Sequence, residues 1–452
     1  MTNQPQDRTT VLQTKLHEAA TADKARRFHA LYDKLYLPYI LQSAWELVRR
    51  NRGAAGVDGQ TIRDIEEGGV EGFLTETAQV VREKTYRPTA VRRVHIPKAD
   101  GRLRPLGIPT IRDRVVQAAA KLVLEPIFEA DFEGCSFGFR PGIGQHDALA
   151  RVKEHSQKGY RFVVDADIEQ FFDNLDHQEL MKALRRRIGD GEMLRLVYRW
   201  LKAGYLLEGE YHDTDLGSPQ GGVLSPLLAN VYLHAFDKAF KQQKAFVGKL
   251  TRYADDFVIQ CGTQDRAQRA LAWASAQLGL LKLRLHQTKT RIVNDREVGF
   301  DFLGFHHRRV ILAKHSRSGA GRESYGILRW PSTSARAKFR SEVRKRLGPP
   351  ALLHDRWKEV MRCLRAYLTG WWHYFRHGQS TKVFSTLDFF VHARVARNLA
   401  RGQPTGKRRR KRTWNYYSQR LTQWGGLPRL LSLRPSDIGP YNGRAKVLWR
   451  AV

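Results

Sequence analysis

The sequence predicts an α+β body followed by a smaller helical module that ends in a basic tail. Helical and strand patterns alternate up to about residue 305, and three segments of helical periodicity follow. Most of the positive charge lies after the same position. Residues 306–452 hold 33 basic and 6 acidic side chains and so carry +27 of the formal net charge of +33. With 452 residues, the chain is long enough for roughly two to four domains.

The composition narrows the class of protein. So large a positive charge favours a polyanionic partner such as nucleic acid. The three cysteines lie far apart, which excludes a disulfide framework and a paired-cysteine zinc site and favours a reducing compartment. The N-terminus lacks a signal-peptide core, and no stretch has the length and apolarity of a membrane-spanning helix. We therefore expect a cytoplasmic protein without a membrane partner.

The first part of the chain is expected to form helices and then a hairpin. Apolar residues recur at helical spacing from Lys24 to Arg52, where a glycine-rich loop follows, and helical character returns from Asp64 to Glu83. Val91–Pro97 alternates apolar and basic residues as a strand does, and Asp100-Gly101 is typical of a hairpin turn.

The middle of the chain combines a long helix with strands that carry carboxylates. Arg112–Phe128 has the apolar stripe of an amphipathic helix. Phe162–Ile168 is a short apolar run interrupted by aspartates. In Leu250–Cys261, two β-rich runs flank Ala254-Asp255-Asp256, so we expect a hairpin with carboxylates at its tip.

Three helices are expected after residue 310, where strand patterns fade. Helical periodicity covers Ser332–Leu347, Leu353–Phe375 and Thr381–Arg401. The irregular tail that follows contains six consecutive cations: Lys407, Arg408, Arg409, Arg410, Lys411 and Arg412.

Three carboxylates in apolar surroundings are the first candidates for chemistry. Burying Asp167, Asp255 or Asp256 unpaired is costly, so these side chains require cations, hydrogen bonds or solvent. Two Mg²⁺ ions about 3.5–4 Å apart, held by hard oxygen ligands, can activate a hydroxyl nucleophile and stabilise the leaving oxygen in phosphoryl transfer. The alternative is that Tyr253-Ala254-Asp255-Asp256 is only a polar turn.

Seven motifs follow one another along the chain and together resemble a known family. They are Gly53-Ala54-Ala55-Gly56-Val57-Asp58-Gly59; Ile96-Pro97-Lys98 through Arg104-Pro105-Leu106-Gly107-Ile108-Pro109; Ser136-Phe137-Gly138-Phe139-Arg140-Pro141-Gly142; Asp167-Ile168 with Phe171-Phe172-Asp173; Ser218-Pro219-Gln220-Gly221-Gly222 with Leu224-Ser225-Pro226; Arg252 through Asp256; and Phe302-Leu303-Gly304-Phe305. In this order they resemble the reverse transcriptases encoded by bacterial group II introns, also called maturases, over about residues 28–400.

The resemblance implies a right-hand polymerase with four parts. Residues 1–90 would form the N-terminal extension and the start of the fingers, and residues 91–305 the fingers and palm. Residues 306–401 would form a helical thumb or maturase domain, and residues 402–452 a basic DNA-binding region.

The resemblance also assigns roles in the palm. Asp167, Asp255 and Asp256, helped by the backbone carbonyl of Ile168, would be the catalytic ligands of two Mg²⁺ ions, for which Mn²⁺ is a candidate substitute. Lys289 matches a basic position after the palm helix, and its role stays open between a function at the site and an ordinary surface cation.

Four further residues would contact the incoming deoxynucleoside triphosphate. Lys98 and Arg104 match the fingers residues that grip the triphosphate, although a solvated basic hairpin is the alternative. Phe172 stands where an aromatic ring excludes ribonucleotides at the sugar C2′ atom, and core packing is its alternative. Gln220 matches a residue that contacts the nucleotide near its sugar.

The resemblance further implies nucleic-acid partners: group II intron RNA, an RNA template with a DNA primer, and target DNA. Arg362, Arg365 and Arg376 would face the template duplex or the intron RNA. Lys407–Arg412 and the tail would bind DNA, with a solvated charged linker as the competing interpretation.

The chain departs from the family pattern in two places. Gly142-Ile143-Gly144-Gln145 stands where the family often has Gly-Arg-Ser-Ala, so a phosphate contact by that arginine is in doubt. The paired cysteines and histidines of a C-terminal endonuclease do not occur before Val452. We therefore expect priming from a pre-existing DNA end.

The main functional hypothesis is an RNA-directed DNA polymerase, a nucleotidyltransferase, that assists splicing of its intron RNA and copies it into cDNA during retrohoming. It would act in the nucleoid-associated cytoplasm of a bacterium. The alternatives are a related reverse transcriptase recruited to a host role such as defence, and a non-enzymatic RNA-binding splicing factor. The intact set of Asp167, Asp255 and Asp256 argues against the latter, because binding alone does not need them.

Overall fold

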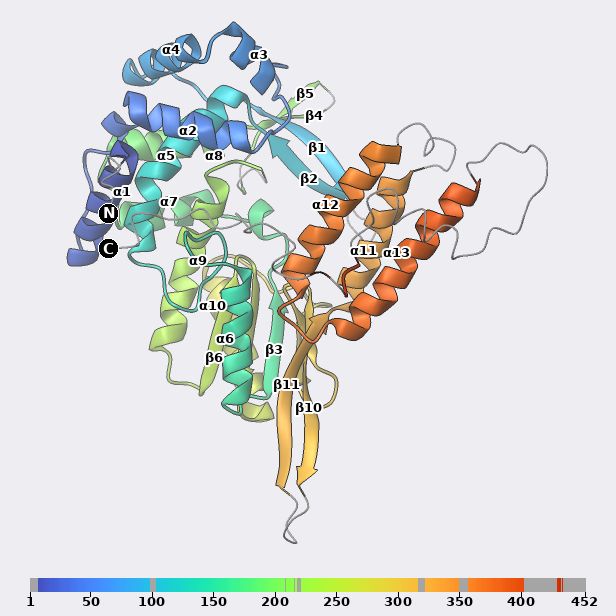
Figure 1. The fold of residues 1–452 in the computed structure, drawn as a ribbon. Helices are drawn as coiled ribbons and strands as arrows, with labels where there is room; N and C mark the ends of the chain where they lie inside the picture. Colours follow the sequence, from blue (N-terminus) through green and yellow to red (C-terminus); the bar gives the residue numbers. More distant parts are fainter. Residues whose placement is uncertain are drawn as a thin grey trace, which may run out of the picture. The chain divides into compact units, whose positions relative to one another are not determined.

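The computed structural model describes residues 7–97, 103–207, 209–214, 216–217, 221–315, 322–348, 357–401, 429–431 and 433. These residues fall into two compact units, one up to residue 155 together with 164–292, and the other comprising 156–163 and the residues from 293 onwards (Figure 1). No helix in the described ranges is long and apolar enough to cross a membrane.

The first unit contains most of the helices and two four-stranded sheets. Its helices are α1 (Arg8–Ala22), η1 (Tyr32–Lys34), α2 (Pro38–Arg50), α3 (Ile62–Gly68), α4 (Val70–Arg82), α5 (Ile111–Glu129), α6 (Gln145–Gln157), η2 (Phe171–Asp173), α7 (His177–Arg185), α8 (Gly191–Leu201), α9 (Ser225–Gln242) and α10 (Gln264–Leu280). Its strands are β1 (Val91–Pro97), β2 (Leu103–Ile108), β3 (Phe162–Asp167), β4 (Tyr205–Leu207), β5 (Glu210–His212), β6 (Gly248–Tyr253), β7 (Asp256–Cys261) and β8 (Arg291–Asn294). The first two residues of β3 and the last two of β8 belong to the second unit.

Helix α5 is the central element of the first unit, and α1 and α2 pack against it. Thr110 caps its N-terminus by accepting a hydrogen bond from the Asp113 N–H (3.1 Å). Pro126 inside α5 has no N–H for the carbonyl of Leu122 one turn earlier. The side chain of Gln13 in α1 donates to that carbonyl instead (3.0 Å). Helix α1 therefore packs where α5 lacks a backbone N–H donor. The sequence did not predict this helix, because its apolar stripe is weak.

The two sheets confirm the strands expected from the sequence. In the sheet of order β2-β1-β4-β5, β1 and β2 pair antiparallel as far as Pro97 opposite Leu103. The predicted turn at Asp100-Gly101 lies outside the described residues. In the sheet of order β6-β7-β3-β8, β6 and β7 form the predicted hairpin, with Tyr253 opposite Asp256 as its last pair.

The second unit combines a strand ribbon with three helices. Its strands β9 (Phe300–Phe302), β10 (Phe305–His315) and β11 (Arg322–Pro331) form a sheet of order β11-β10-β9, and its helices are α11 (Thr333–Leu347), α12 (Trp357–Phe375) and α13 (Thr381–Arg401). Helix α11 contacts both α12 and α13. The three predicted helices are confirmed within the described residues.

The expectation that strands fade after residue 310 is wrong. Strands β10 and β11 form a long antiparallel ribbon that continues to Pro331, with His306 opposite Trp330 and Val310 opposite Gly326. Both faces of a ribbon can remain partly exposed, so its residues need no strict apolar alternation. Arg308 and Ile311 are both exposed, which removes the pattern that would reveal a half-buried strand.

Part of the tail packs on the last helix. Leu430 is buried, and its N–H donates to the Asp388 carboxylate in α13 (2.8 Å), as does the N–H of Leu431 (3.0 Å). The cations Lys407–Arg412 lie outside the described residues.

Asp190 joins the N-terminal segment to α8. One carboxylate oxygen accepts from the backbone N–H groups of Leu31 and Tyr32 (both 2.8 Å), and the other accepts from Glu192 (3.0 Å) and Met193 (3.1 Å). Burial alone would raise the pKa of Asp190, but the four N–H donors outweigh it and hold the pKa below its ordinary value.

We predict that Asp190→Asn lowers the free energy of unfolding at pH 7 by roughly 1–3 kcal/mol, because a neutral amide cannot accept all four hydrogen bonds. A carboxylate with a lowered pKa in the folded state stabilises above its unfolded pKa of about 3.9, and the stabilisation is lost as the pH falls through the folded value. The difference between wild type and variant should thus shrink in acid. Urea unfolding at pH 7 and in acid measures it, with the exposed carboxylate variant Asp33→Asn as control. A difference independent of pH would contradict the ionised carboxylate.

Candidate active site

The hairpin of β6 and β7 presents Ala254 and Asp255 as a two-residue turn between Tyr253 and Asp256. Ala254 has a φ of 58°, a left-handed conformation that non-glycine residues keep only where the surroundings hold it. The turn that carries the predicted carboxylates therefore depends on its support.

Arg252 of β6 supplies that support, and its side chain is 0% exposed. The guanidinium donates to the carbonyl of Ala254 (2.9 Å) and to both carboxylate oxygens of Asp237, through Nε (2.8 Å) and Nη2. It also donates to Ser136 Oγ (2.7 Å) and Asn230 Oδ1 (3.2 Å). A buried ion pair whose donors all find acceptors fixes its partners in one arrangement.

The loop Ser136–Gly142 packs directly on the same turn. Asn230 of α9 donates from Nδ2 to the carbonyl of Gly138 (2.7 Å). A Cβ atom at Gly138 would lie 3.0 Å from the backbone carbon of Tyr253 and closer still to the nitrogen of Ala254. Only glycine allows this approach of two backbones.

The predicted carboxylates Asp167 and Asp255 lie near each other and near two cations. Burial raises the pKa of Asp255, and the charge of Asp167 raises it further, whereas Arg104 and Lys289 act in the opposite direction. Lys289 donates to Asp167 Oδ2. In the first unit, the charges of Asp167, Arg104 and Lys289 thus all lie close enough to Asp255 to affect its pKa. The role of Lys289, left open by the sequence, includes pairing with Asp167.

Ile168 follows Asp167 at the end of β3 and forms an isolated antiparallel bridge with Leu285. The bridge uses the carbonyl of Asp167, which accepts from His286, and the N–H of Glu169. Neither bond uses the carbonyl of Ile168, the group that the resemblance assigns to metal binding.

Phe172 lies in η2 beside a core residue. Phe171 is 2% exposed, while Phe172 is half-buried and meets the Phe171 ring edge-on at 5.2 Å between centroids. Partial exposure leaves Phe172 accessible to a ligand, and its contact with Phe171 also contributes to packing.

Gln220 lies outside the described residues, whereas Gly217 and Gly221 are described and each lies close to another backbone. A Cβ at Gly217 would lie 2.8 Å from the carbonyl oxygen of Phe172, and one at Gly221 would lie 2.5 Å from that of Gly107 in β2. Both glycines have positive φ, of 90° and 117°. Gly217 therefore lies against η2 and Gly221 against β2, each close to another motif.

The remaining predicted residues belong to the second unit or lie outside the described ranges. Arg362 and Arg365 are exposed on α12, and Arg376 lies over the ring of Trp372 at 5.1 Å. Lys98 and Lys407–Arg412 are outside the described residues.

The chemistry of the donor groups fits a divalent cation. Burial is the main reason for the raised pKa of Asp255, and the negative charge of Asp167 adds to it; a cation would offset both effects. Their oxygens are the hard ligands that Mg²⁺ prefers. In the described ranges, no group of three His, Cys, Asp or Glu side chains is already arranged to hold a metal ion.

Sequence patterns did not reveal the residues that support the turn. Asp237 and Asn230 lie seven positions apart on one face of α9 and are both buried. A polar pair at this spacing within an apolar helix was the available signal, but it did not indicate Arg252 as the partner.

Two family models match the chain. The model described as reverse transcriptase (RNA-dependent DNA polymerase) covers residues 96–307. The model described as the group II intron maturase-specific domain covers residues 337–417.

Curated relatives agree with these models. Protein YkfC of Escherichia coli is 35% identical over 73% of this chain and 93% of its own length. The group II intron-encoded protein LtrA of Lactococcus lactis is 42% identical over 48% of this chain but 36% of its own length, so the match spans about a third of LtrA. Among solved structures, a Cas6-RT-Cas1–Cas2 complex contains a chain with 24% identity and a TM-score of 0.36, over 56% of this chain and 43% of that chain.

We predict that Gly138→Ala lowers the free energy of unfolding by about 1–3 kcal/mol, because the added Cβ would force the loop and the turn apart. Gly144→Ala is the matched control, since a Cβ there meets nothing within 4 Å. Urea unfolding of the two variants measures the difference. Equal stabilities would contradict the close packing of Gly138 on Ala254.

Proposed function

Because this chain belongs to the reverse transcriptases that carry a group II intron maturase domain, we propose that it binds group II intron RNA, assists its splicing and copies it into cDNA during retrohoming. Its reverse transcriptase domain is an RNA-directed DNA polymerase that depends on a divalent metal. The relative LtrA is a group II intron-encoded protein, which does not favour a role recruited by the host.

The observation that carries this proposal is the convergence of Asp167, Asp255, Arg104 and Lys289 in the first unit. Paired carboxylates flanked by cations suit nucleotidyl transfer, in which negative charge develops on the leaving pyrophosphate. A purely RNA-binding role would not need a conformationally strained turn held by a buried ion pair.

We propose two Mg²⁺ ions as the metal, with Mn²⁺ able to substitute. The carboxylates of Asp167, Asp255 and Asp256 and the carbonyl of Ile168 would hold them. The ions would supply activation of the primer hydroxyl and stabilisation of the leaving oxygen.

The nucleotide would be bound by residues near this site. Arg104 lies close enough to Asp255 to affect its pKa, which favours a role with Lys98 at the triphosphate. Phe172 would face the sugar C2′ atom, and Gln220 would contact the nucleotide near its sugar.

Nucleic acid would bind mainly through the basic second unit. We assign fingers and palm to residues 91–305 after the N-terminal extension, thumb or maturase helices to 306–401, and the DNA-binding region to 402–452. Arg362, Arg365 and Arg376 would contact template duplex or intron RNA, and Lys407–Arg412 would contact target DNA through its phosphates. The protein would work in the nucleoid-associated cytoplasm of a bacterium.

We predict that Asp255→Asn lowers the rate of metal-dependent cDNA synthesis on a primed RNA template by roughly 10²–10³-fold or more, because charge stabilisation at the reacting phosphate is lost. RNA affinity should change little. Asp265→Asn, which removes an exposed carboxylate from α10, is the control. Undiminished extension by Asp255→Asn would exclude it as a catalytic ligand.

We predict that Phe172→Ala raises ribonucleotide incorporation relative to deoxyribonucleotide incorporation, because the ring no longer occupies the space that a 2′-hydroxyl needs. Single-nucleotide extension with each substrate measures the ratio. An unchanged ratio in a folded variant would leave Phe172 as a packing residue only.

A further inference from the structure

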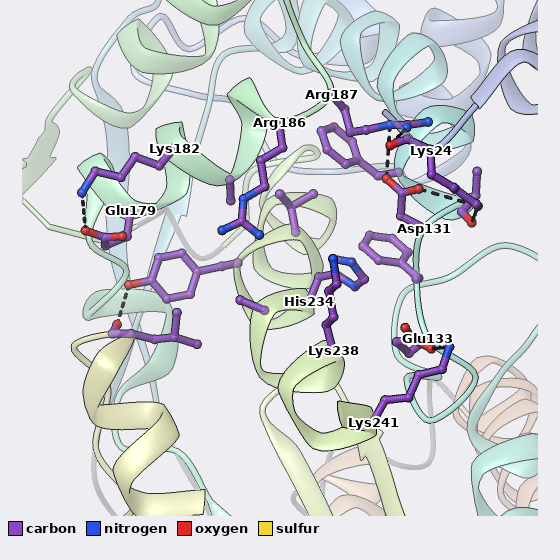
Figure 2. A pocket seen from close by; sticks show the side chains of 18 residues that line it. Lys24, Asp131, Glu133, Glu179, Lys182, Arg186, Arg187, His234, Lys238 and Lys241 are labelled. Atoms are coloured by element: carbon purple, nitrogen blue, oxygen red, sulfur yellow. Dashed lines mark hydrogen bonds and ion pairs between the residues drawn. The ribbon is translucent and has the colours of Figure 1, made fainter. Parts of the chain in front are cut away.

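A cavity outside the candidate active site lies in the first unit. Its volume is about 530 Å³, and its walls come from the end of α5 with the loop after it, from α7 and from α9 (Figure 2). None of its described lining residues belongs to the candidate active site.

The carboxylates on the cavity wall are already neutralised by cations. The ion pairs are Asp131 with Arg187 (3.2 Å) and Lys24 (3.7 Å), Glu133 with Lys241 (2.9 Å), and Glu179 with Lys182 (2.8 Å). These acids therefore repel an entering anion only weakly.

Three other polar side chains keep unused hydrogen-bonding capacity. In the described part of the chain, the side chains of Arg186 and Lys238 have no carboxylate or hydrogen-bond partner, and the buried Nδ1 atom of His234 has none either. His234 and Lys238 lie one turn apart on α9. Figure 2 shows the Arg186 guanidinium, from the end of α7, and the His234 ring directed toward the same space.

The surroundings of His234 favour a ring-bearing ligand. Burial lowers the pKa of His234, so the imidazole is neutral at pH 7 and can donate from one nitrogen and accept at the other. Its ring meets the edge of the Phe132 ring at 6.0 Å between centroids. The cavity thus combines two unpaired cations with a neutral polar ring and an aromatic neighbour.

We propose that this cavity binds a nucleoside phosphate, with the phosphate between Arg186 and Lys238 and the base near His234. Two cations match the charge of a phosphate monoester. The volume falls in the range of about 300–1,000 Å³ typical of small-molecule sites, whereas inorganic phosphate alone would leave most of it to water. A free mononucleotide and the 5′-terminal nucleotide of an RNA share this chemistry. The proposal is independent of the polymerase reaction.

The test uses the full chain, freed of nucleic acid and kept in a metal chelator so that metal-dependent nucleotide binding does not contribute. Calorimetric titration with adenosine 5′-monophosphate should show saturable binding at one site. Adenosine and inorganic phosphate should each bind more weakly, because each offers half of the recognised groups. No saturable binding, or inorganic phosphate binding as tightly as the nucleotide, would overturn the proposal.

A charge-matched pair of variants locates the site. The double variant Arg186→Gln/Lys238→Gln should weaken nucleotide binding by about tenfold or more. Lys153→Gln/Lys244→Gln, which removes the same charge from the first unit outside the cavity, should leave it within about twofold. Both variants should retain primer extension, which separates this site from the polymerase. Equal affinities in the two variants would refute the location.

Competition identifies the natural source of the ligand. The two competitors are a 5′-phosphorylated RNA trinucleotide and the same trinucleotide without the phosphate. If the phosphorylated one displaces the mononucleotide more strongly, the site accepts an RNA end. Failure of both trinucleotides to compete would assign the site to free nucleotides.

Discussion

The buried ion pair of Arg252 with Asp237 is the interaction on which the rest of the candidate site depends. Both side chains are 0% exposed, so each charge has lost its water and must be compensated within the protein. Removing one partner of such a pair costs about 3–5 kcal/mol, because the other charge is left unpaired. The pair is satisfied only if α9, β6 and the loop at Ser136 take one arrangement, and that arrangement places the carbonyl of Ala254 on the guanidinium.

Close backbone contacts extend this constraint to the other motifs. Gly138 lies against the turn, Gly221 against Gly107 of β2, and Gly217 against the backbone of η2. At each position a side chain would need space that another backbone occupies. The motifs that are far apart in the sequence are therefore neighbours in the first unit, and their glycines are the residues that permit it.

Helix α9 serves two adjacent regions of the first unit. Asn230 and Asp237 lie on the face that supports the turn. His234 and Lys238 lie on a neighbouring face that lines the cavity shown in Figure 2. An α-helix has 3.6 residues per turn, so adjacent side chains such as Asp237 and Lys238 point about 100° apart around its axis. They can therefore lie in different surroundings. One helix thus carries the polar network that supports the turn and, on a neighbouring face, His234 and the cation Lys238.

The sequence by itself determined the class of the fold, the helices with strong apolar stripes and the hairpin that carries Asp255 and Asp256, because periodicity and turn residues are local properties. The ordered motifs also determined the family, and the charge distribution indicated a nucleic-acid partner. Only the tertiary structure decided that Lys289 pairs with Asp167, that Asp237 supports Ala254 through Arg252, and that Arg186 and His234 line one cavity. It also decided the ribbon after Phe305, whose partly exposed faces leave no apolar alternation. These contacts join residues distant in the chain, and no local pattern specifies which side chains will share a buried charge or a cavity wall.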